Sequence, residues 1–255
     1  MNGLLNLFYP LLDALDGLLG FLPAALRVVL LGVLSGAVAM GLYRLLSDQG
    51  KIRAQKEEIK RLRAALAAAQ DDLGETLRLS RRNLAASFRL LGVVVGPALL
   101  SSLPLLVVIA WLAAHYGYTV PAPGTLVPLA FEPAPDGVAV EPEGALRQEA
   151  QGPRLLWPAP GGAAPRFVDA QGLVYAGPPP ELPTTVVHKK LWWNWLLGNE
   201  AGYLRPDAGL EAITFELAPR VLVPGVPAWL GGWEAVYFLS VLVASLLIKF
   251  RFKIE

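Results

Sequence analysis

Three long stretches of the chain are almost entirely apolar. They cover residues 21–46, 90–114 and 235–248, and the second has no charged residue at all. A helix needs about 20 apolar residues to cross the roughly 30 Å hydrocarbon core of a bilayer. The pattern therefore predicts two full transmembrane helices and a shorter third one. Pro97 and Pro104 lie inside the second stretch and predict kinks in its helix.

The residues near the ends of these stretches suit a membrane interface. Arg27 and Arg44 are 17 positions apart, about 25 Å along a helix. Each can therefore extend its charge to a different membrane surface. The residues that we expect at membrane interfaces are Arg27, Trp111, Trp229, Trp233, Lys249 and Arg251.

The distribution of charge predicts an orientation. Residues 44–89 contain 11 basic and 6 acidic side chains, a net charge of +5, whereas residues 115–232 contain 7 and 11, a net charge of −4. Because cytoplasmic segments are enriched in Lys and Arg, we expect residues 44–89 and the C-terminus in the cytoplasm and the N-terminus outside. The composition, rich in Ala, Gly, Pro and Arg, favours the plasma membrane of a prokaryote. Only 17% of residues are charged, against about 25% in soluble domains.

The first twenty residues have helical amphipathic spacing. Leucines and Phe8 recur at intervals of three and four, with Asn6, Asp13 and Asp16 between them. No Lys or Arg precedes this stretch, so it does not resemble a cleavable signal peptide. We expect an amphipathic helix over 1–20 that lies on the outer membrane surface. The alternative is a helix packed on an extracytoplasmic domain.

A coiled-coil pattern begins directly after the first apolar stretch. Apolar residues recur every seven positions at Ile52, Ile59, Leu66 and Leu73. Asp71 or Asp72 can cap a second helix. The apolar residues that we assign to that helix are Leu73, Leu77, Leu84 and Phe88. The pattern predicts an antiparallel helical hairpin over 48–89 that projects into the cytoplasm.

Many basic residues decorate this hairpin. One interpretation is a solvated face that satisfies the charge rule for cytoplasmic segments. The other is contact with anionic lipid, a nascent chain or ribosomal RNA. The residues assigned to such contact are Lys51, Arg53, Lys60, Arg61, Arg63, Arg78, Arg81 and Arg82.

Between the second and third apolar stretches, short strand-like runs alternate with Pro and Gly. The runs lie at 125–132, 137–141, 154–158, 166–170, 172–177, 184–190 and 211–218, with "RVLV" at 220–223. They predict a compact β-rich extracytoplasmic domain over 117–232. The segment "LWWNWLLGNEAGYL" (191–204) is expected to pack beneath the strands, the alternative being contact with the bilayer interface.

Together these patterns predict an α-helical membrane protein with three transmembrane helices, a cytosolic hairpin and an inserted β-rich domain. The expected segments are 1–20, 21–47, 48–89, 90–116, 117–232, 233–250 and the tail 251–255. The chain has no cysteine, and neither His115 nor His188 has a partner at metal-ligand spacing. We therefore expect no catalytic residue, no metal, no cofactor and no enzyme activity.

Two stretches resemble a known family. "GLYRLLSDQGKIRAQKEEIKRLRAAL" (41–66) and "SRRNLAASFRLLGVVVGPALLSSLPLLVVIAWL" (80–112) are similar to the YidC-like membrane insertase superfamily, especially its archaeal members and the insertase subunit of the ER membrane complex. The resemblance covers residues 21–114, and 233–250 by topology only. It implies a polar groove that is open to the cytoplasm and to lipid. The chain departs from the family in having only two methionines and a large insert.

The resemblance assigns residues to this groove. Arg44 matches the basic position at the cytosolic end of the first span, Arg89 lies at the start of the second, and Gly32, Ser35 and Gly36 give the first span a small-residue face. The arginines have a second interpretation as membrane anchors, and the small residues as a helix-packing face.

The implied function is a membrane protein insertase or chaperone. Its expected partners are the lipid bilayer, nascent membrane proteins, the ribosome and other envelope or insertase subunits. Two other functions stay open. One is a membrane-anchored scaffold whose outer β-rich domain binds an envelope partner, and the other is a handler of lipids or envelope polymers that uses the Trp-rich segment.

Overall fold

The computed structural model describes residues 3–69, 72–133 and 138–254. The contacts divide the chain into two compact units. We call Met1–Arg27 with Val107–Ala235 the sheet unit, and Val28–Leu106 with Val236–Glu255 the helix unit. The boundaries between the units fall within or next to helices, so each long apolar helix contributes residues to both.

Three helices are long and apolar enough to cross a membrane. They are α2 (Ala24–Leu46), α4 (Leu73–Tyr116) and α6 (Trp233–Phe252). These helices indicate a multi-pass membrane protein. Helix α6 has 20 residues, which at about 1.5 Å per residue corresponds to about 30 Å. This length matches the hydrocarbon thickness of a bilayer better than the length of its 14-residue apolar stretch does. Pro97 and Pro104 both lie inside the 44-residue helix α4.

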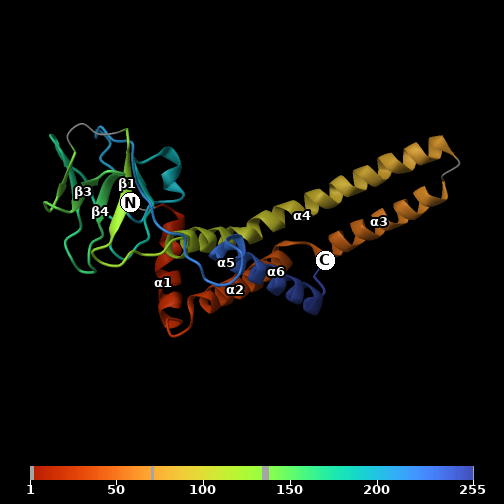
Figure 1. The fold of residues 1–255 in the computed structure, drawn as a ribbon. Helices are drawn as coiled ribbons and strands as arrows, with labels where there is room; N and C mark the ends of the chain where they lie inside the picture. Colours follow the sequence, from red (N-terminus) through yellow and green to blue (C-terminus); the bar gives the residue numbers. More distant parts are fainter. Residues whose placement is uncertain (1–2, 70–71, 134–137, 255) are drawn as a thin grey trace. The chain divides into compact units, whose positions relative to one another are not determined.

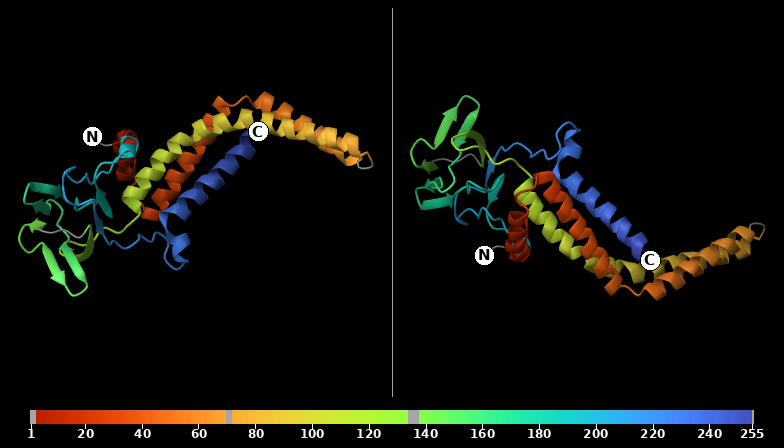
Figure 2. Two further views of the ribbon diagram at one scale, coloured as in Figure 1. Left: turned by 90° about the horizontal axis from the view of Figure 1, so that it is seen from above. Right: turned by 90° about the horizontal axis from the view of Figure 1, so that it is seen from below.

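Helix α3 (Gln49–Ala68) and the first part of α4 run side by side as a hairpin in the helix unit (Figures 1 and 2). Asp48 caps α3, since its Oδ1 accepts a 3.0 Å hydrogen bond from the amide of Lys51. Asp72 caps α4 by accepting from the amides of Gly74 and Glu75 at 2.9 and 3.1 Å. Asp71, the other predicted cap, lies outside the described residues. Each arm of the hairpin therefore begins at an aspartate, where backbone amides need an acceptor.

The buried seam of the hairpin differs in part from the expected one. Ile52 and Ile59 of α3 are buried as predicted, at 0% and 7% exposure. In α4, however, the buried residues are Leu79 and Ala86, which are also seven apart. The four predicted apolar residues, Leu73, Leu77, Leu84 and Phe88, are all exposed. These four residues belong to the second helix of the hairpin, as expected, but they do not occupy its buried positions.

Small residues of α2 allow α6 to pack closely against it. A Cβ atom on Gly32 would meet Cβ of Ser240 at 2.7 Å and the carbonyl of Tyr237 at 3.0 Å. A Cβ on Gly36 would meet the carbonyl of Val241 at 3.0 Å. Gly32, Ser35 and Gly36 are all buried. This close approach is typical of membrane helices, whose association depends on direct packing.

The described residues of the sheet unit form eight strands in two antiparallel sheets. One sheet has the order β3-β4-β1-β8-β7 and the other β2-β5-β6. In the first, Leu129 of β1 pairs with Phe215 of β8, and Val127 pairs with Leu155 of β4. The strands are β1 (Leu126–Glu132), β2 (Ala139–Glu141), β3 (Leu146–Glu149), β4 (Gly152–Leu156), β5 (Arg166–Asp169), β6 (Gly172–Ala176), β7 (Val186–His188) and β8 (Ala212–Phe215).

An aromatic core holds the two sheets together. Phe167 of β5 is fully buried, and its ring lies within 6.5 Å, between centroids, of the rings of Phe131, Tyr175 and Phe215. Trp157, which is 1% exposed, packs edge-on against Phe215. This is the compact β-rich region that the sequence predicts between the second and third apolar helices. The predicted run 220–223 is not a strand, since the prolines at 219 and 224 bound it on both sides.

The N-terminal segment packs on the sheet unit. It comprises η1 (Leu5–Phe8) and α1 (Tyr9–Leu18). Backbone amides of Leu4 and Leu5 donate to the carbonyls of Trp195 and Leu196 at 2.8 and 2.9 Å. The side chain of Asn6, which is buried, bonds both the amide and the carbonyl of Gly198. These bonds tie the start of the N-terminal segment to residues 195–198, and its position on a membrane surface stays a prediction.

The Trp-rich segment that receives these bonds is largely exposed. It contains η2 (Trp192–Trp195), in which Trp192 is 84% and Trp195 is 61% exposed, while Asn194 is buried. The expectation that these tryptophans pack beneath the strands was wrong. Asn194 takes the inner position because its side chain accepts from the amide of Leu191 and donates to the carbonyl of Leu197, which fixes the turn. The last short helix, α5 (Ala228–Gly231), precedes α6.

Candidate functional site

A groove of about 620 Å³ lies in the helix unit. Residues of α2, α3, α4 and α6 line it, and most of its surface is apolar. Its polar members are two lysines, two serines and a tyrosine. The lining residues are Ala39, Met40, Tyr43, Ile52, Lys56, Ser87, Leu90, Leu91, Val94, Ala98, Ser101 and Lys249.

The two serines of the groove are satisfied within α4. Ser87 Oγ donates to the carbonyl of Asn83 at 2.9 Å, and Ser101 Oγ donates to the carbonyl of Ala98 at 3.0 Å. Each hydroxyl oxygen keeps acceptor capacity. Lys56 comes from the hairpin and Lys249 from the last turn of α6, so two cations from different helices border one apolar space. Such a groove can accept an apolar segment together with an acidic or polar flank.

An exposed apolar stripe runs along α4 within the helix unit. Its residues recur at intervals of three, four or seven positions, which keeps them on one face of the helix. Every member is at least 40% exposed. We call these residues the α4 stripe: Leu73, Leu77, Leu84, Phe88, Leu91, Val95 and Leu99. The stripe extends from the charged hairpin into the uncharged stretch 90–114 of α4. Leu91 belongs to both the stripe and the groove.

Arg44 and Arg89, the arginines assigned to a groove by resemblance, do not line this one. Both side chains are exposed. Cζ of Arg44 lies 6.0 Å from the ring centroid of Phe252, a cation–π contact at the end of α6. Gly32, Ser35 and Gly36 lie in the contact between α2 and α6 described above. Of the two groove lysines, Lys249 was expected as an interface anchor, and Lys56 as one of the basic residues that decorate the hairpin.

The basic residues of the hairpin lie on its exposed surface. Several pair with nearby acids of the same helix: Lys51 with Asp48 at 3.2 Å, and Arg78 with Glu75 at 2.6 Å. The hydrogen bond from Arg78 holds the pKa of the Glu75 carboxyl below its usual value. The remaining residues assigned to lipid or nascent-chain contact, Arg53, Lys60, Arg61, Arg63, Arg81 and Arg82, are exposed as well.

The predicted interface anchors lie in different environments. Trp229 is 76% exposed, and Arg251 is exposed with its Cζ 5.8 Å from the Phe252 ring centroid. Trp111 and Trp233 are buried inside the sheet unit, at 1% and 6% exposure. This differs from the expectation for lipid-facing anchors, because Trp111 donates its indole N–H to Asp13 at 2.7 Å instead.

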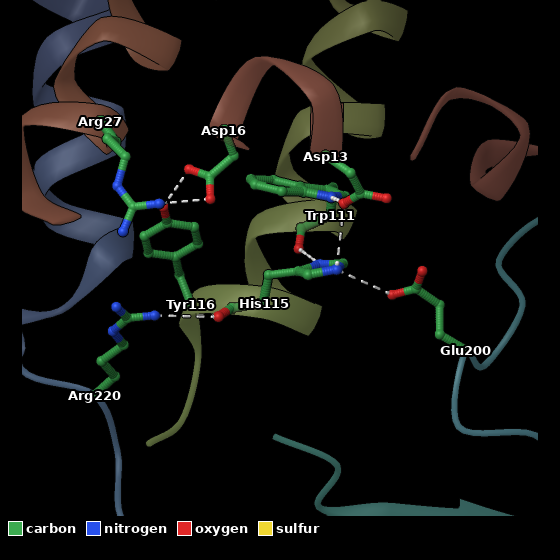
Figure 3. A network of polar contacts seen from close by, with 8 residues as sticks. All are labelled: Asp13, Asp16, Arg27, Trp111, His115, Tyr116, Glu200 and Arg220. Atoms are coloured by element: carbon green, nitrogen blue, oxygen red, sulfur yellow. Dashed lines mark hydrogen bonds and ion pairs between the residues drawn. The ribbon is translucent and has the colours of Figure 1, made fainter. Parts of the chain in front are cut away.

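A polar network joins α1, α2 and α4 within the sheet unit (Figure 3). Arg27, expected to extend towards the membrane surface, forms a 2.6 Å ion pair with Asp16 of α1. The hydroxyl of Tyr116 donates to the other carboxylate oxygen of Asp16. The Arg27 and Arg220 guanidinium groups both lie over the Tyr116 ring, with Cζ 5.6 and 4.7 Å from its centroid.

His115 stands at the centre of a second part of this network (Figure 3). Its Nδ1 donates to the carbonyl of Trp111 at 2.9 Å, because a carbonyl oxygen only accepts. Its Nε2 lies 3.5 Å from Asp13 and 3.6 Å from Glu200. The ring stacks on Trp111 with centroids 4.6 Å apart and meets Tyr9 edge-on. His115 therefore links α1, α4 and the loop that carries Glu200.

Burial shapes the chemistry of two groups in this part. The pKa of Glu200 is raised, first by burial and then by the negative charge of Asp13, while His115 acts in the opposite direction. Burial, followed by the charges of Glu200 and Asp13, also raises the pKa of the Tyr9 hydroxyl. Oε2 of Glu200 is fully shielded from solvent and accepts no hydrogen bond from the described residues.

Sequence reasoning missed Glu200, and it did not indicate that Lys56 and Lys249 border one groove. Asp13, His115 and Glu200 are far apart in the sequence, so their meeting depends on the fold of the whole sheet unit. A weak signal was present, since Asp13 and Asp16 interrupt an otherwise apolar helix. Within residues 3–69, 72–133 and 138–254, no cluster of three or more His, Cys, Asp or Glu side chains is arranged to hold a metal ion.

Comparison of the chain with models of known protein families, with curated proteins and with solved structures gave no match.

Proposed function

We propose that this protein is a YidC-like membrane insertase that eases apolar segments of nascent proteins into the bilayer. In this proposal α2, α4 and α6 span the plasma membrane of a prokaryote. The N-terminus and the β-rich region lie outside, and the hairpin and C-terminus lie in the cytoplasm. The partners are lipid, nascent membrane proteins and the ribosome, and the process uses no nucleotide or cofactor.

The observation that carries the proposal is the lysine-bordered groove in the helix unit. It combines an apolar wall with Lys56 and Lys249. The α4 stripe adds a second support, because it continues from the hairpin to Leu91 in the groove. An apolar segment can bind along this stripe before it reaches lipid.

The physical advantage of such a groove is a smaller desolvation barrier. A charged side chain at the bilayer centre costs about 2.5–3.5 kcal/mol on insertion scales. The acidic flank of an inserting segment would meet Lys56 and Lys249 in a space less polar than water, where attraction between opposite charges is stronger. The apolar part of the same segment meanwhile contacts the groove wall and then lipid.

Site-directed crosslinking tests the proposal. A photoreactive residue at Met40 or Leu91, which line the groove, should crosslink to ribosome-bound nascent chains that carry a transmembrane segment. The matched control is a probe at Val38, which is 40% exposed on α2 and does not line the groove. Equal crosslinking at all three positions, or none at any of them, would contradict the assignment and favour a scaffold that acts through the β-rich region.

The contribution of the lysines can be measured in liposomes. Lys249→Gln should reduce the insertion of substrates with acidic translocated tails by about tenfold relative to neutral tails, the equivalent of about 1.4 kcal/mol of lost attraction. Arg251→Gln is the control, since Arg251 is two residues further along α6 and exposed. If both variants lose activity equally, or if tail charge does not matter, Lys249 has no part in the mechanism.

A further inference from the structure

A second cavity, of about 290 Å³, lies wholly within the sheet unit. We call it the Glu200 cavity. Three segments form its walls: α1 through Tyr9, the C-terminal end of α4, and the loop from residues 182 to 201. Its volume is at the lower end of the range of about 300–1,000 Å³ that small-molecule sites occupy. A ligand that fits it is therefore compact.

Aromatic side chains line much of the Glu200 cavity. Tyr9 comes from α1, Tyr118 from the chain just after α4, His188 from β7 and Trp193 from η2. The rings of His188 and Trp193 are 5.8 Å apart between centroids. Aromatic faces carry partial negative charge and attract cations. The rest of the lining is small or apolar, apart from threonines, asparagines and Glu200.

One carboxylate faces this aromatic lining. Glu200 lines the cavity, and its Oε2 is shielded from solvent and accepts no hydrogen bond from the residues that the structure describes. Nε2 of His115 lies 3.6 Å away, but Asp13 lies at a similar distance from the same nitrogen. One imidazole thus serves two carboxylates. The Glu200 side chain is 21% exposed, so its carboxylate is partly removed from water without a full partner, and a cation brought into the cavity would offset that cost.

We propose that the Glu200 cavity binds a compact organic ammonium group. The carboxylate of Glu200 supplies the counter-charge, and the rings of Tyr9, Tyr118 and Trp193 supply cation–π contact. This inference does not rest on the proposed insertase function, because every residue involved lies in the sheet unit.

The position of the cavity in the sequence suggests where such a group comes from. Ala110, Ala113 and Ala114 line the cavity and end the uncharged run of α4, so they belong to the part of a transmembrane helix that meets lipid headgroups. The ammonium group of an ethanolamine or choline headgroup and a free amine share the same chemistry. The experiment below distinguishes these two sources.

Binding should also be linked to protons. The pKa of Glu200 is raised by burial, and a bound cation would favour the ionised carboxylate. Affinity should therefore increase as the pH rises through the titration of Glu200. Other ionisable groups line this site or lie close to it: Asp13 and Tyr9 from α1, His115 from α4, Tyr118 just after α4, and His188 from β7.

The test is calorimetric titration of the full-length protein in a detergent without an ammonium group. Choline is the probe, and 3,3-dimethylbutan-1-ol, its uncharged carbon isostere, is the comparison. Choline should bind at least about tenfold more tightly than the isostere. Glu200→Gln should weaken choline binding by at least about tenfold and remove most of its pH dependence. Equal affinity for the two probes, or no measurable binding of either, would overturn the proposal.

Two further variants separate a binding role from a structural one. Glu181→Gln removes an exposed carboxylate that directly precedes this loop and does not line the cavity, and it should leave choline affinity unchanged. Trp193→Leu, in a partly exposed turn, should weaken choline but not the isostere. If Glu181→Gln weakens binding as much as Glu200→Gln does, general surface charge explains the result and the proposal fails.

The source of the ammonium group is tested in nanodiscs. If the cavity takes a headgroup, free choline should compete poorly in phosphatidylethanolamine discs and bind normally in phosphatidylglycerol discs. If the cavity takes a free amine, choline should bind equally in both. Loss of choline binding in both disc types, with Glu200→Gln indistinguishable from the unmodified chain, would contradict binding from either source.

Discussion

The two units of this protein differ in what covers their apolar side chains. The sheet unit buries a cluster of aromatic and aliphatic residues that includes Trp157, Phe167 and Phe215. The helix unit buries few large side chains and leaves the whole α4 stripe exposed. In water such a stripe would be costly. The sheet unit therefore carries its own core, whereas the helix unit leaves much of its apolar surface uncovered by its own residues.

The polar contacts differ in the same way. The ion pair of Arg27 with Asp16 in the sheet unit has side chains only 18% and 20% exposed. The pair of Arg61 with Glu57 in the helix unit has side chains 83% and 60% exposed at a distance of 3.9 Å. Water and salt weaken the second pair far more than the first. The Arg27–Asp16 pair can therefore fix geometry in the sheet unit, whereas the Arg61–Glu57 pair contributes little to the geometry of the hairpin.

Substitution of two phenylalanines should show the largest contrast between the units. Phe167→Ala removes a fully buried ring from the aromatic core and should lower the free energy of unfolding by about 3–5 kcal/mol. Phe88→Ala removes a ring that is 64% exposed and should change it by about 0.5 kcal/mol or less. Thermal unfolding in detergent, with limited proteolysis of the β-rich region, measures both. Similar effects for the two variants would mean that the units do not differ as described.

Two glycines of α2 allow a matched test of helix packing. Gly32→Val should destabilise the helix unit by about 1–3 kcal/mol, because the new side chain would collide with Ser240 and the carbonyl of Tyr237. Gly41→Val makes the same change in the same helix, where a Cβ would meet nothing within 4 Å. Unfolding temperatures of the two variants give the comparison. A Gly41 variant as unstable as the Gly32 variant would point to helix propensity and not to packing.

The two ion pairs predict a smaller difference. Asp16→Asn removes the partner of Arg27 and an anionic acceptor of Tyr116, and should cost about 1–3 kcal/mol. Glu57→Gln should cost about 0.2–0.5 kcal/mol, an effect that high salt should abolish. Urea unfolding at low and high ionic strength distinguishes them. If high salt also abolishes the loss of stability in Asp16→Asn, the two ion pairs do not differ as described.

The smallest expected effect is the pH dependence that Glu200 adds to the sheet unit. Its pKa is raised above the ordinary value of 4.5 by burial and by Asp13, although His115 opposes the shift. Between 4.5 and the raised value the folded state holds more protons than the unfolded state, so the free energy of unfolding should fall as the pH rises. Glu200→Gln should flatten this slope, which unfolding curves between pH 4 and pH 8, about the range over which a shifted carboxyl titrates, can reveal. An unchanged slope would remove Glu200 as its cause.

Local pattern was sufficient to predict much of the fold. The apolar stretches became α2, α4 and α6, and the runs at 125–132 and 211–218 became β1 and β8, because each has the hydrophobic period of its element. Strand β3 (Leu146–Glu149) was missed, since only one of its four residues is apolar. It forms because a turn places it beside β4, where Leu146 pairs with Leu155. Pairing with a neighbour overrode the local pattern.

The candidate sites were harder to predict from the sequence. Lys56 was one of many similar basic residues on the hairpin, and only the arrangement of four helices selects it together with Lys249. The sequence showed the charged residues of the polar network in the sheet unit, but it did not show which residue each of them contacts. Asp16 and Tyr116 are 100 residues apart, and no sequence spacing indicates that they meet.

The pairing of Asn6 with Gly198 also has a consequence for biosynthesis. These residues are 192 positions apart, and the N-terminal segment completes its backbone bonds only when residues 195–198 exist. At a synthesis rate of about 5–20 residues per second, the interval is roughly 10–40 s. During that time the segment around Asn6 has none of these bonds, and Leu7 and Leu11 are exposed even in the finished protein. This segment is therefore synthesised well before the residues that fix its final place.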